Sequence, residues 1–362
     1  MSASFDIAVI GSGAAGIAAA ISAARAGCPT LLIDQKAEAG GTGGFSGLTT
    51  LCGLYDDEGQ MLNNGFTKEF AESLRETEPQ RMGRVWVLPY RPARFLEIAK
   101  KLLEATPNIR TIWNTQLSNV RVERNRITSL NGFSVSAVID CTGTAEVARA
   151  VQAECLATDE TTQAPAIIFP LHNVTRDLGS VAAATQVMLP VARAGLPPVS
   201  FQPDLEPGAV MVKFTGTTEQ VPQLIHLLRT KVSGFENCIT PLTEFTPVRR
   251  AGRMIVGKYL LKGDDVLSGR KFPDAVARCA WPIEQWGADG KVQLRYLPEH
   301  THYEIPSRCL RAASIENLFM AGKTISADVD AIASARVMGC CLATGAAAGK
   351  LAADWLHSSD KA

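Results

Sequence analysis

Apolar runs alternate with a glycine-rich turn and a small-residue stretch over the first 34 residues of the chain. Residues 7–10 (Ile-Ala-Val-Ile) are apolar, residues 11–16 read Gly-Ser-Gly-Ala-Ala-Gly, an alanine-rich stretch follows, and residues 31–33 (Leu-Leu-Ile) lead to Asp34. Short apolar runs bounded by turn residues predict buried parallel strands, and the alanine-rich stretch between them predicts a helix. The pattern therefore predicts a βαβ unit at the start of an α/β protein.

The glycines and the acid have the spacing of a dinucleotide-binding unit. Gly11 lets the strand turn sharply, Gly13 leaves no Cβ between the backbone and a pyrophosphate, and Gly16 lets the helix pack closely on the sheet. The helix N-terminus offers unpaired N–H groups to phosphates, and Asp34 can accept hydrogen bonds from ribose hydroxyls. A glycine-rich turn in another kind of α/β protein is the alternative. The candidate nucleotide-binding residues here are Gly11, Gly13, Ala14, Ala15, Gly16, Asp34 and Gln35.

Two further segments of the N-terminal part are candidates for contact with the cofactor. Residues 38–47 are rich in glycine and predict a loop over which a flat cofactor passes at backbone distance, with a flexible surface loop as the alternative. Residues 109–139 form short extended runs that predict a small antiparallel meander, which ends on a second buried strand at Asp140. The candidate cofactor-binding residues of these segments are Gly41, Thr42, Gly43, Val120, Thr142 and Gly143.

The middle of the chain differs in character from its two ends. Between about residue 150 and residue 305 prolines are frequent and the glycine-turn pattern of the first unit does not recur. The last segment returns to the α/β pattern, because residues 317–322 predict a short strand and turn and residues 331–356 predict one long helix of small residues. We therefore expect a discontinuous Rossmann-like cofactor domain, residues 1–150 and 306–362, with an inserted mixed α+β substrate domain, residues 151–305.

Composition and charge exclude several other classes of protein. Lys and Arg together number 36, as do Asp and Glu, so no overall field favours nucleic acid or an anionic membrane. The longest weakly polar stretch, residues 14–24, is shorter than the ~20 apolar residues that span a bilayer, and no signal-peptide pattern precedes the first strand. Nine cysteines without C-x-x-C or metal-ligand spacing predict reduced thiols, a cytoplasmic location and no metal.

Several motifs resemble those of FAD-dependent oxidoreductases of the glutathione-reductase fold type. The matching residues include Asp140-Cys141-Thr142-Gly143, Tyr303-Glu304-Ile305-Pro306-Ser307-Arg308-Cys309-Leu310, Asn317-Leu318-Phe319-Met320-Ala321-Gly322 and Arg336-Val337-Met338. The resemblance covers residues 1–150 and about 245–355. It implies FAD as the cofactor, which the first unit alone does not distinguish from NAD, and it adds Gly322, Asp330 and Ala333 to the candidate FAD-binding residues.

The last helix has two possible roles in this comparison. A helix that begins near residues 331–333 would direct its N-terminus at the flavin, where negative charge collects on reduction; the alternative is a helix that serves only for packing. Two positions depart from the family pattern. Val329 stands where members commonly have a His, and the turn after Gly143 lacks its usual acid, although Glu146 follows. A His-based mechanism, or flavin attachment through that His, therefore does not carry over.

Histidines and arginines are the candidates for chemistry at the substrate. His172 follows an apolar run of the middle segment, and His300 and His302 precede the family-like segment 303–310; each is a candidate to line the active site, with a structural role as the alternative. Arginine suits substrate anchoring because its guanidinium stays charged, and surface ion pairs are the alternative. Arg308 is the candidate catalytic arginine, and further candidates to bind a carboxylate are Arg249, Arg250, Arg253 and Arg336.

One complete G-x-G-x-x-G unit is present, so we expect no second domain for NAD(P)H. We expect an FAD-dependent oxidoreductase that takes a hydride from a small amine, amino acid or hydroxy acid and is reoxidised by oxygen or an electron acceptor. The alternatives are a flavin-dependent monooxygenase that uses an external reductant, and a maturase that oxidises a residue of a partner protein. No nucleic-acid or membrane partner is expected, and the oligomeric state stays open.

Overall fold

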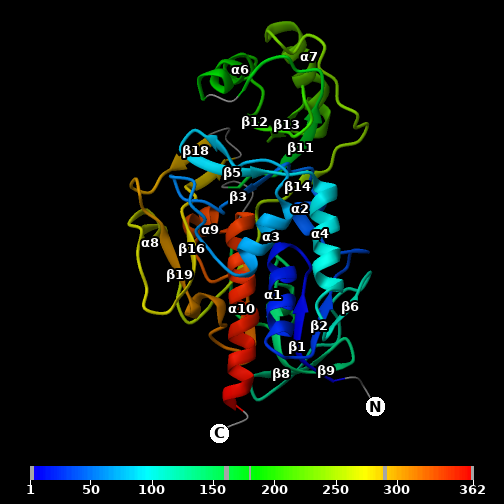
Figure 1. Cartoon of the computed structure of the whole chain (residues 1–362), viewed down its shortest axis with the longest axis vertical. Helices are drawn as coiled ribbons and strands as arrows, with labels where there is room; N and C mark the ends of the chain where they lie inside the picture. Colours follow the sequence, from blue (N-terminus) through cyan, green and yellow to red (C-terminus); the bar gives the residue numbers. More distant parts are fainter. Residues whose placement is uncertain (1–3, 159–162, 179–180, 288–291, 360–362) are drawn as a thin grey trace.

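A computed structural model of the chain describes residues 4–158, 163–178, 181–287 and 292–359 (Figure 1). Residues 1–3, which precede the first strand, lie outside this part. The main sheet occupies the lower half of the view in Figure 1, and a smaller sheet with two helices lies at the top.

The main sheet has seven strands in the order β6-β2-β1-β9-β8-β7, and β20 also pairs with β9. Its strands are β1 (Ser4–Ile10), β2 (Thr30–Ile33), β6 (Ile109–Ile112), β7 (Arg121–Glu123), β8 (Arg126–Leu130), β9 (Phe133–Asp140) and β20 (Leu318–Met320). β6, β2, β1, β9 and β20 are parallel, whereas β8 and β7 form an antiparallel ribbon on β9. The expected α/β, Rossmann-like arrangement is confirmed.

One strand differs from its prediction. Residues 109–112 were expected in the antiparallel meander, but they form β6, which pairs in parallel with β2. The reason is the connection: α4 (Pro92–Glu104) precedes β6, and a crossover through a helix returns the chain as a parallel neighbour. The meander is limited to β7, β8 and β9.

Both faces of the main sheet are buried, as the continuous apolar runs of its strands require. Along β1, Ile7 and Val9 join one core with the helices, whereas Ala8 and Ile10 join a second core with Ile127 and other side chains. The first core is formed largely by α1 (Ala14–Arg25) and α10 (Met338–Ser359).

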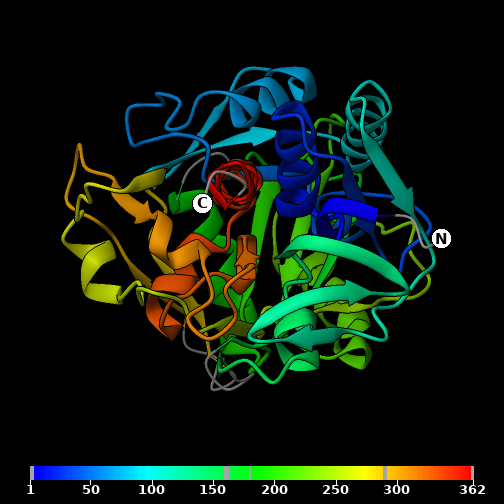
Figure 2. The same ribbon diagram turned by 90° about the horizontal axis from the view of Figure 1, so that it is seen from below.

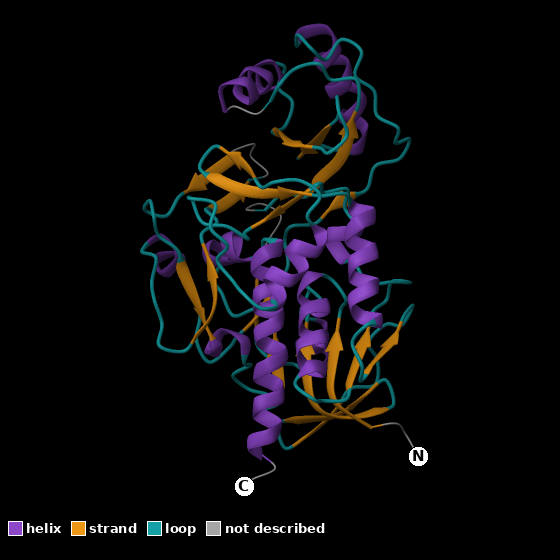
Figure 3. Cartoon of the chain, viewed as in Figure 1, coloured by secondary structure: helices purple, strands orange, loops and turns teal. Residues whose placement is uncertain are grey.

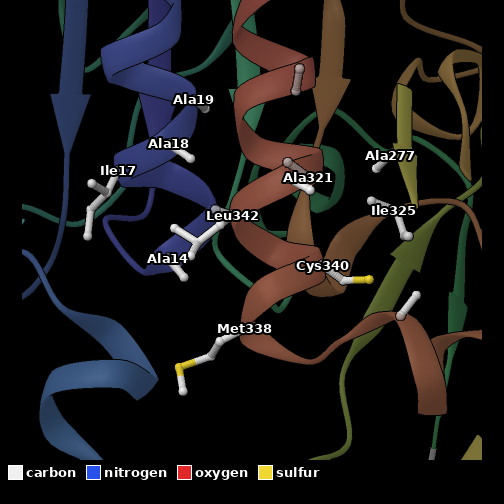
Figure 4. Close-up of a cluster of buried hydrophobic side chains, with 14 of the residues drawn as sticks. Ala14, Ile17, Ala18, Ala19, Ala277, Ala321, Ile325, Met338, Cys340 and Leu342 are labelled. Atoms are coloured by element: carbon white, nitrogen blue, oxygen red, sulfur yellow. The ribbon is translucent and has the colours of Figure 1, made fainter. Parts of the chain in front are cut away.

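α1 and α10 lie side by side at backbone distance (Figure 2, where α10 is seen end-on). A Cβ on Gly345 would lie 2.2 Å from the carbonyl oxygen of Ala15, and a Cβ on Gly349 would lie 2.4 Å from that of Ala19. Figure 4 shows Ala18 and Leu342 near this contact. The glycines of α10 therefore tie the C-terminal end of the chain to the helix that follows the N-terminal glycine turn.

The single helix predicted over residues 331–356 is two helices. α9 (Val329–Ala335) ends before Arg336, and α10 begins at Met338 after a bend of 96°. Within the described residues no single helix is long and apolar enough to cross a membrane, and this bent pair passes that test only when its two parts are taken together.

The remaining elements form small sheets and short helices (Figure 3). α4 is amphipathic, with Phe95, Ile98, Ala99 and Leu103 buried. The strands of the smaller sheets outside the middle segment's own sheet are β3 (Thr50–Cys52), β4 (Gln80–Met82), β5 (Val85–Pro89), β10 (Cys155–Ala157), β15 (Arg253–Ile255), β16 (Ala275–Cys279), β17 (Ile283–Trp286), β18 (Val292–Arg295) and β19 (Tyr303–Pro306). The short helices are α2 (Gly41–Phe45), α3 (Phe66–Leu74), α5 (Glu146–Ala150), α8 (Gly263–Leu267), η1 (Thr218–Gln220), η2 (Ser307–Leu310) and η3 (Gly322–Thr324).

The middle segment builds an antiparallel sheet with its own core. This sheet has the order β12-β13-β11-β14 and carries α6 and α7. Its elements are β11 (Ala166–Leu171), α6 (Val181–Arg193), β12 (Val199–Pro203), β13 (Val210–Phe214), α7 (Val221–Lys231) and β14 (Pro247–Val248). Side chains from Met254 to Ile305 instead share the core around α1 and α10. The division at residues 150 and 305 stays a prediction.

Gly349→Ala is expected to lower the free energy of unfolding by about 1–3 kcal/mol, the usual cost of overpacking. The added methyl would contact the Ala19 carbonyl, and the gain in helix propensity of up to ~1 kcal/mol is smaller. Urea denaturation followed by circular dichroism measures the change. Lys350→Ala, at the exposed neighbouring position, is the control. Equal stability of Gly349→Ala and wild type would contradict the close helix contact.

Candidate functional site

A cavity of about 410 Å³ lies at the carboxyl ends of the parallel strands, where ligands bind in sheets of this kind. Gly11 follows β1, Asp34 follows β2, Thr142 follows β9 and Gly322 follows β20, and all four line the cavity. The turns that the sequence marked separately are therefore brought to one place by the parallel order of the strands.

The glycines of the first turn have different structural roles. Gly11 has φ +95°, and a Cβ there would lie 2.6 Å from the carbonyl oxygen of Cys141; a Cβ on Gly16 would lie 1.7 Å from that of Gly11. A Cβ on Gly13 would meet only the Cα of Gly41, at 3.8 Å. Gly11 and Gly16 are thus required by the fold itself, whereas Gly13 leaves space at the cavity wall for a ligand.

Two carboxylates hold the turns in position. Asp34 lines the cavity and accepts hydrogen bonds from the Ser12 amide at 2.5 Å and the Ser12 hydroxyl at 2.7 Å. Asp140 is fully buried and accepts from the Thr142 amide and hydroxyl and from two amides of α5. Burial raises the pKa of Asp140, and these donors oppose that rise. The turn with Thr142 and Gly143 is thereby fixed against the sheet.

The N-terminus of α10 lies at the cavity. The sequence had instead predicted a helix that starts there near residues 331–333. Asp328 caps α9 by accepting from the amides of Asp330 at 3.1 Å and Ala331 at 2.8 Å. Val337, Met338 and Cys341, at the start of α10, line the cavity. The bend between the two helices therefore presents the first turn of α10 to the cavity.

Part of the cavity lining is basic. Lys213 of β13, Arg250 and Arg336 surround Glu284 of β17, and Lys323 lies nearby. Lys213 Nζ lies 3.9 Å from Glu284 Oε1, and their side chains are 14% and 16% exposed. Burial lowers the pKa of Lys213, and burial together with Arg336 lowers that of Lys323 to about 8. We call Lys213, Arg250 and Arg336 with Glu284 the basic cluster.

Glu284 is held by two indoles. Its Oε2 accepts from Trp281 Nε1 at 3.0 Å and its Oε1 accepts from Trp286 Nε1 at 2.6 Å. Burial alone would raise the pKa of Glu284, but Lys213 and Arg336 outweigh burial and lower it to about 2. Glu284 is therefore ionised at neutral pH.

Most of the predicted cofactor residues meet at this cavity. The residues that line it are Gly11, Gly13, Ala14, Ala15, Asp34, Gln35, Gly41, Thr42, Gly43, Thr142, Gly143, Gly322 and Ala333. Gly16 packs under the turn, Val120 is half-buried in the second core, and Asp330 accepts from Gln285 and pairs with Arg295 at 2.5 Å. These three are not among the lining residues.

The four predicted catalytic residues are not among the lining residues. His172 contacts Glu206 at 3.2 Å, His300 contacts Glu58 at 2.9 Å, and His302 lies 4.0 Å from Glu304. Arg308 pairs with Asp274 at 3.1 Å. Their positions give no support to a catalytic role. Of the other arginines, Arg249, Arg250 and Arg336 line the cavity, whereas Arg253 does not.

The sequence did not mark four residues of the cavity lining as site candidates. They are Lys213, Glu284, Trp281 and Lys323. Lys213 lies in the apolar run Val-Met-Val-Lys-Phe of β13, and a lone charge in a buried strand is the signal that could have found it. Glu284 stands between two tryptophans, a weaker signal. Within the described residues, no group of three or more His, Cys, Asp and Glu is placed to hold a metal ion.

Comparison with known proteins gives a family and a fold. The family described as FAD dependent oxidoreductase matches residues 6–209 and 200–360. No curated protein sequence matches the chain. A geranylgeranyl bacteriochlorophyll reductase-like protein from Thermoplasma acidophilum has a similar structure, with 12% identity and a TM-score of 0.55, over 99% of this chain and 80% of that chain.

Two other solved structures are similar. GidA from Aquifex aeolicus has 13% identity and a TM-score of 0.55, over 98% of this chain and 64% of that chain, so this chain spans less than two thirds of GidA. The p-nitrophenol 4-monooxygenase from Pseudomonas putida has 10% identity and a TM-score of 0.52, over 100% of this chain and 81% of that chain. At such identities the similarity shows the fold alone.

Gly13→Ala is expected to weaken FAD binding about tenfold or more, while the flavin-free protein keeps its stability. The added Cβ has ordinary contact distances in the fold but stands at the cavity wall. Gly16→Ala, the matched variant, should instead destabilise the flavin-free protein because its Cβ would overlap the Gly11 carbonyl. Fluorescence titration with FAD and thermal melting separate the two effects, and equal FAD affinity of Gly13→Ala and wild type would contradict the assignment.

Glu284 should make stability depend on pH in the acid range. The pKa of Glu284 is lowered from 4.5 to about 2 in the folded state, so its contribution, roughly 3 kcal/mol, is present above pH 4.5 and is lost as the pH falls towards 2. The difference in unfolding free energy between wild type and Glu284→Gln should therefore shrink between pH 5 and pH 3. Glu316→Gln, at an exposed ion pair, is the control. A difference that does not change with pH would contradict this pairing.

Proposed function

Because the chain belongs to the family of FAD-dependent oxidoreductases, we propose that it takes a hydride from a small organic substrate held at the basic cluster. The observation that carries the proposal is that the glycine turns and the basic cluster line one and the same cavity. Bound FAD supplies a two-electron acceptor, which oxygen or another acceptor reoxidises. A shared cavity supports direct contact between cofactor and substrate.

The chain's own residues have three tasks in this proposal. Lys213, Arg250 and Arg336 orient the substrate by charge, and Glu284 offsets part of their mutual repulsion. Apolar side chains such as Ile168 and Trp281 exclude water from the cavity. The first turn of α10 offers N–H groups that stabilise negative charge developing beside it.

We extend the proposal to the arrangement of the domains. The antiparallel β7–β8 ribbon on a parallel sheet supports a cofactor domain of the glutathione-reductase type. A substrate-binding role for residues 151–305 is supported by the origin of Lys213, Arg250 and Glu284, which all come from that segment, whereas the glycine turns come from the two ends of the chain.

A flavin-dependent monooxygenase is the second candidate. The similarity in fold to the p-nitrophenol 4-monooxygenase favours it, and it requires a reductant from outside. The low exposure of Lys213 and Glu284, 14% and 16%, favours a small molecule over a segment of a partner protein, as a maturase would bind.

Absorbance spectra of the purified protein and anaerobic titration with NADH and NADPH test the proposal. We expect flavin absorbance, released into the supernatant by acid because Val329 offers no attachment point, and no bleaching by either nicotinamide. Rapid bleaching by a nicotinamide would favour the monooxygenase. A protein that binds no flavin, even after incubation with FAD, would overturn the proposed function.

A further inference from the structure

The basic cluster carries positive charge that the protein does not balance. Lys213, Arg250 and Arg336 face a single carboxylate there, that of Glu284. An ion buried without a partner is strongly disfavoured. The excess therefore points to a ligand with negative charge.

The carboxylate of Glu284 accepts no hydrogen bond from the three cations. Its two oxygens accept from Trp281 and Trp286, and Lys213 Nζ lies 3.9 Å away, beyond hydrogen-bond distance. Arg336 donates to Gln163 Oε1 at 2.8 Å and to the Glu284 backbone oxygen at 3.3 Å, not to the carboxylate.

Arg250 has a buried donor that no residue of the described part of the chain uses. Its Nη1 donates to the backbone oxygen of Ala164 at 3.1 Å, whereas Nη2 is buried and has no hydrogen-bond partner within the described residues. Burial and the nearby Arg336 lower the pKa of Arg250 to about 10, so it is still charged at neutral pH.

Lys213 and Arg250 converge on one side chain. Lys213 Nζ lies 5.8 Å and Arg250 Cζ lies 5.0 Å from the centre of the Trp286 ring. Two cations on one indole, one of them a guanidinium with an unused donor, suit the two oxygens of a carboxylate.

Apolar side chains form part of the cavity wall. They include Leu48, Ala166, Ile168, Val248 and Val337. Ala166 and Ile168 are two residues apart on β11, so they project from the same face of the strand. The ligand that fits this surface has an apolar body beside its charged group.

We propose that the substrate is a carboxylic acid with an apolar body, whose carboxylate binds between Lys213 and Arg250 and whose body packs against β11 and the start of α10. This proposal rests on the proposed function, because it names the substrate class of the same cavity. In this proposal the phosphates of the nucleotide bind at Gly13 and the start of α1.

Titration calorimetry of the flavin-loaded and the flavin-free protein with benzoate and with benzamide, its uncharged isostere, tests the proposal. We expect benzoate to bind at least about tenfold more tightly. Lys213→Met and Arg250→Met should each remove most of that preference, and Arg250→Lys should restore part of it. Lys68→Met, which removes an exposed cation, should leave it unchanged. Flavin absorbance and melting temperature establish that each variant is folded; if Arg250→Met fails to fold, Lys213→Met decides.

Equal binding of benzoate and benzamide would overturn the carboxylate proposal. So would a benzoate preference seen only in the flavin-free protein, because the basic cluster would then serve FAD itself. Tighter binding of inorganic phosphate than of benzoate would also overturn it. All these outcomes leave a flavin-containing protein, so they are distinct from failure of the proposed function, which is the absence of bound flavin.

Discussion

The contact between α1 and α10 is the constraint on which the rest of the site depends. Gly345 and Gly349 let the two backbones meet, so the helix at the C-terminal end of the chain lies directly on the helix that follows the N-terminal glycine turn. Thr344 of α10 accepts a hydrogen bond from the Gly322 amide at 3.1 Å, and Gly322 faces Ala15. The two ends of the chain thereby contribute to one wall of the cavity.

Charge is the second organising feature. Burying three cations around one carboxylate is unfavourable unless each group has partners. The protein supplies partners for Glu284 through two indoles and for Arg336 through an amide and a backbone oxygen, but it leaves a buried donor on Arg250. An unpaired buried donor lowers the stability of the folded state. In the proposal above, a hydrogen bond to the carboxylate of the substrate restores that stability.

The N-terminal glycine turn was predictable because its geometry is local. The first turn is formed by residues close together in the sequence, Gly11, Gly13 and Gly16, so their spacing alone predicts its geometry. The same holds for the turn at Thr142 and Gly143. The single helix predicted over residues 331–356 was wrong in one respect, because the segment forms two helices. Its small residues are compatible with a continuous helix, and nothing in their pattern marks the 96° bend between α9 and α10.

The sequence by itself determined the α/β class and the glycine turn after the first strand, since these depend on short motifs and on the periodicity of apolar residues. Its resemblance to FAD-dependent oxidoreductases implied FAD as the cofactor. Only the tertiary structure decided which charged side chains line the cavity. The basic cluster comes from four separate segments of the chain, which contribute Lys213, Arg250, Glu284 and Arg336. The four residues predicted to be catalytic from their sequence neighbours lie outside the cavity lining; they are His172, His300, His302 and Arg308. Spacing along the chain carries no record of such long-range contacts, because the packing of β13, β17 and the α9–α10 bend brings these charges together.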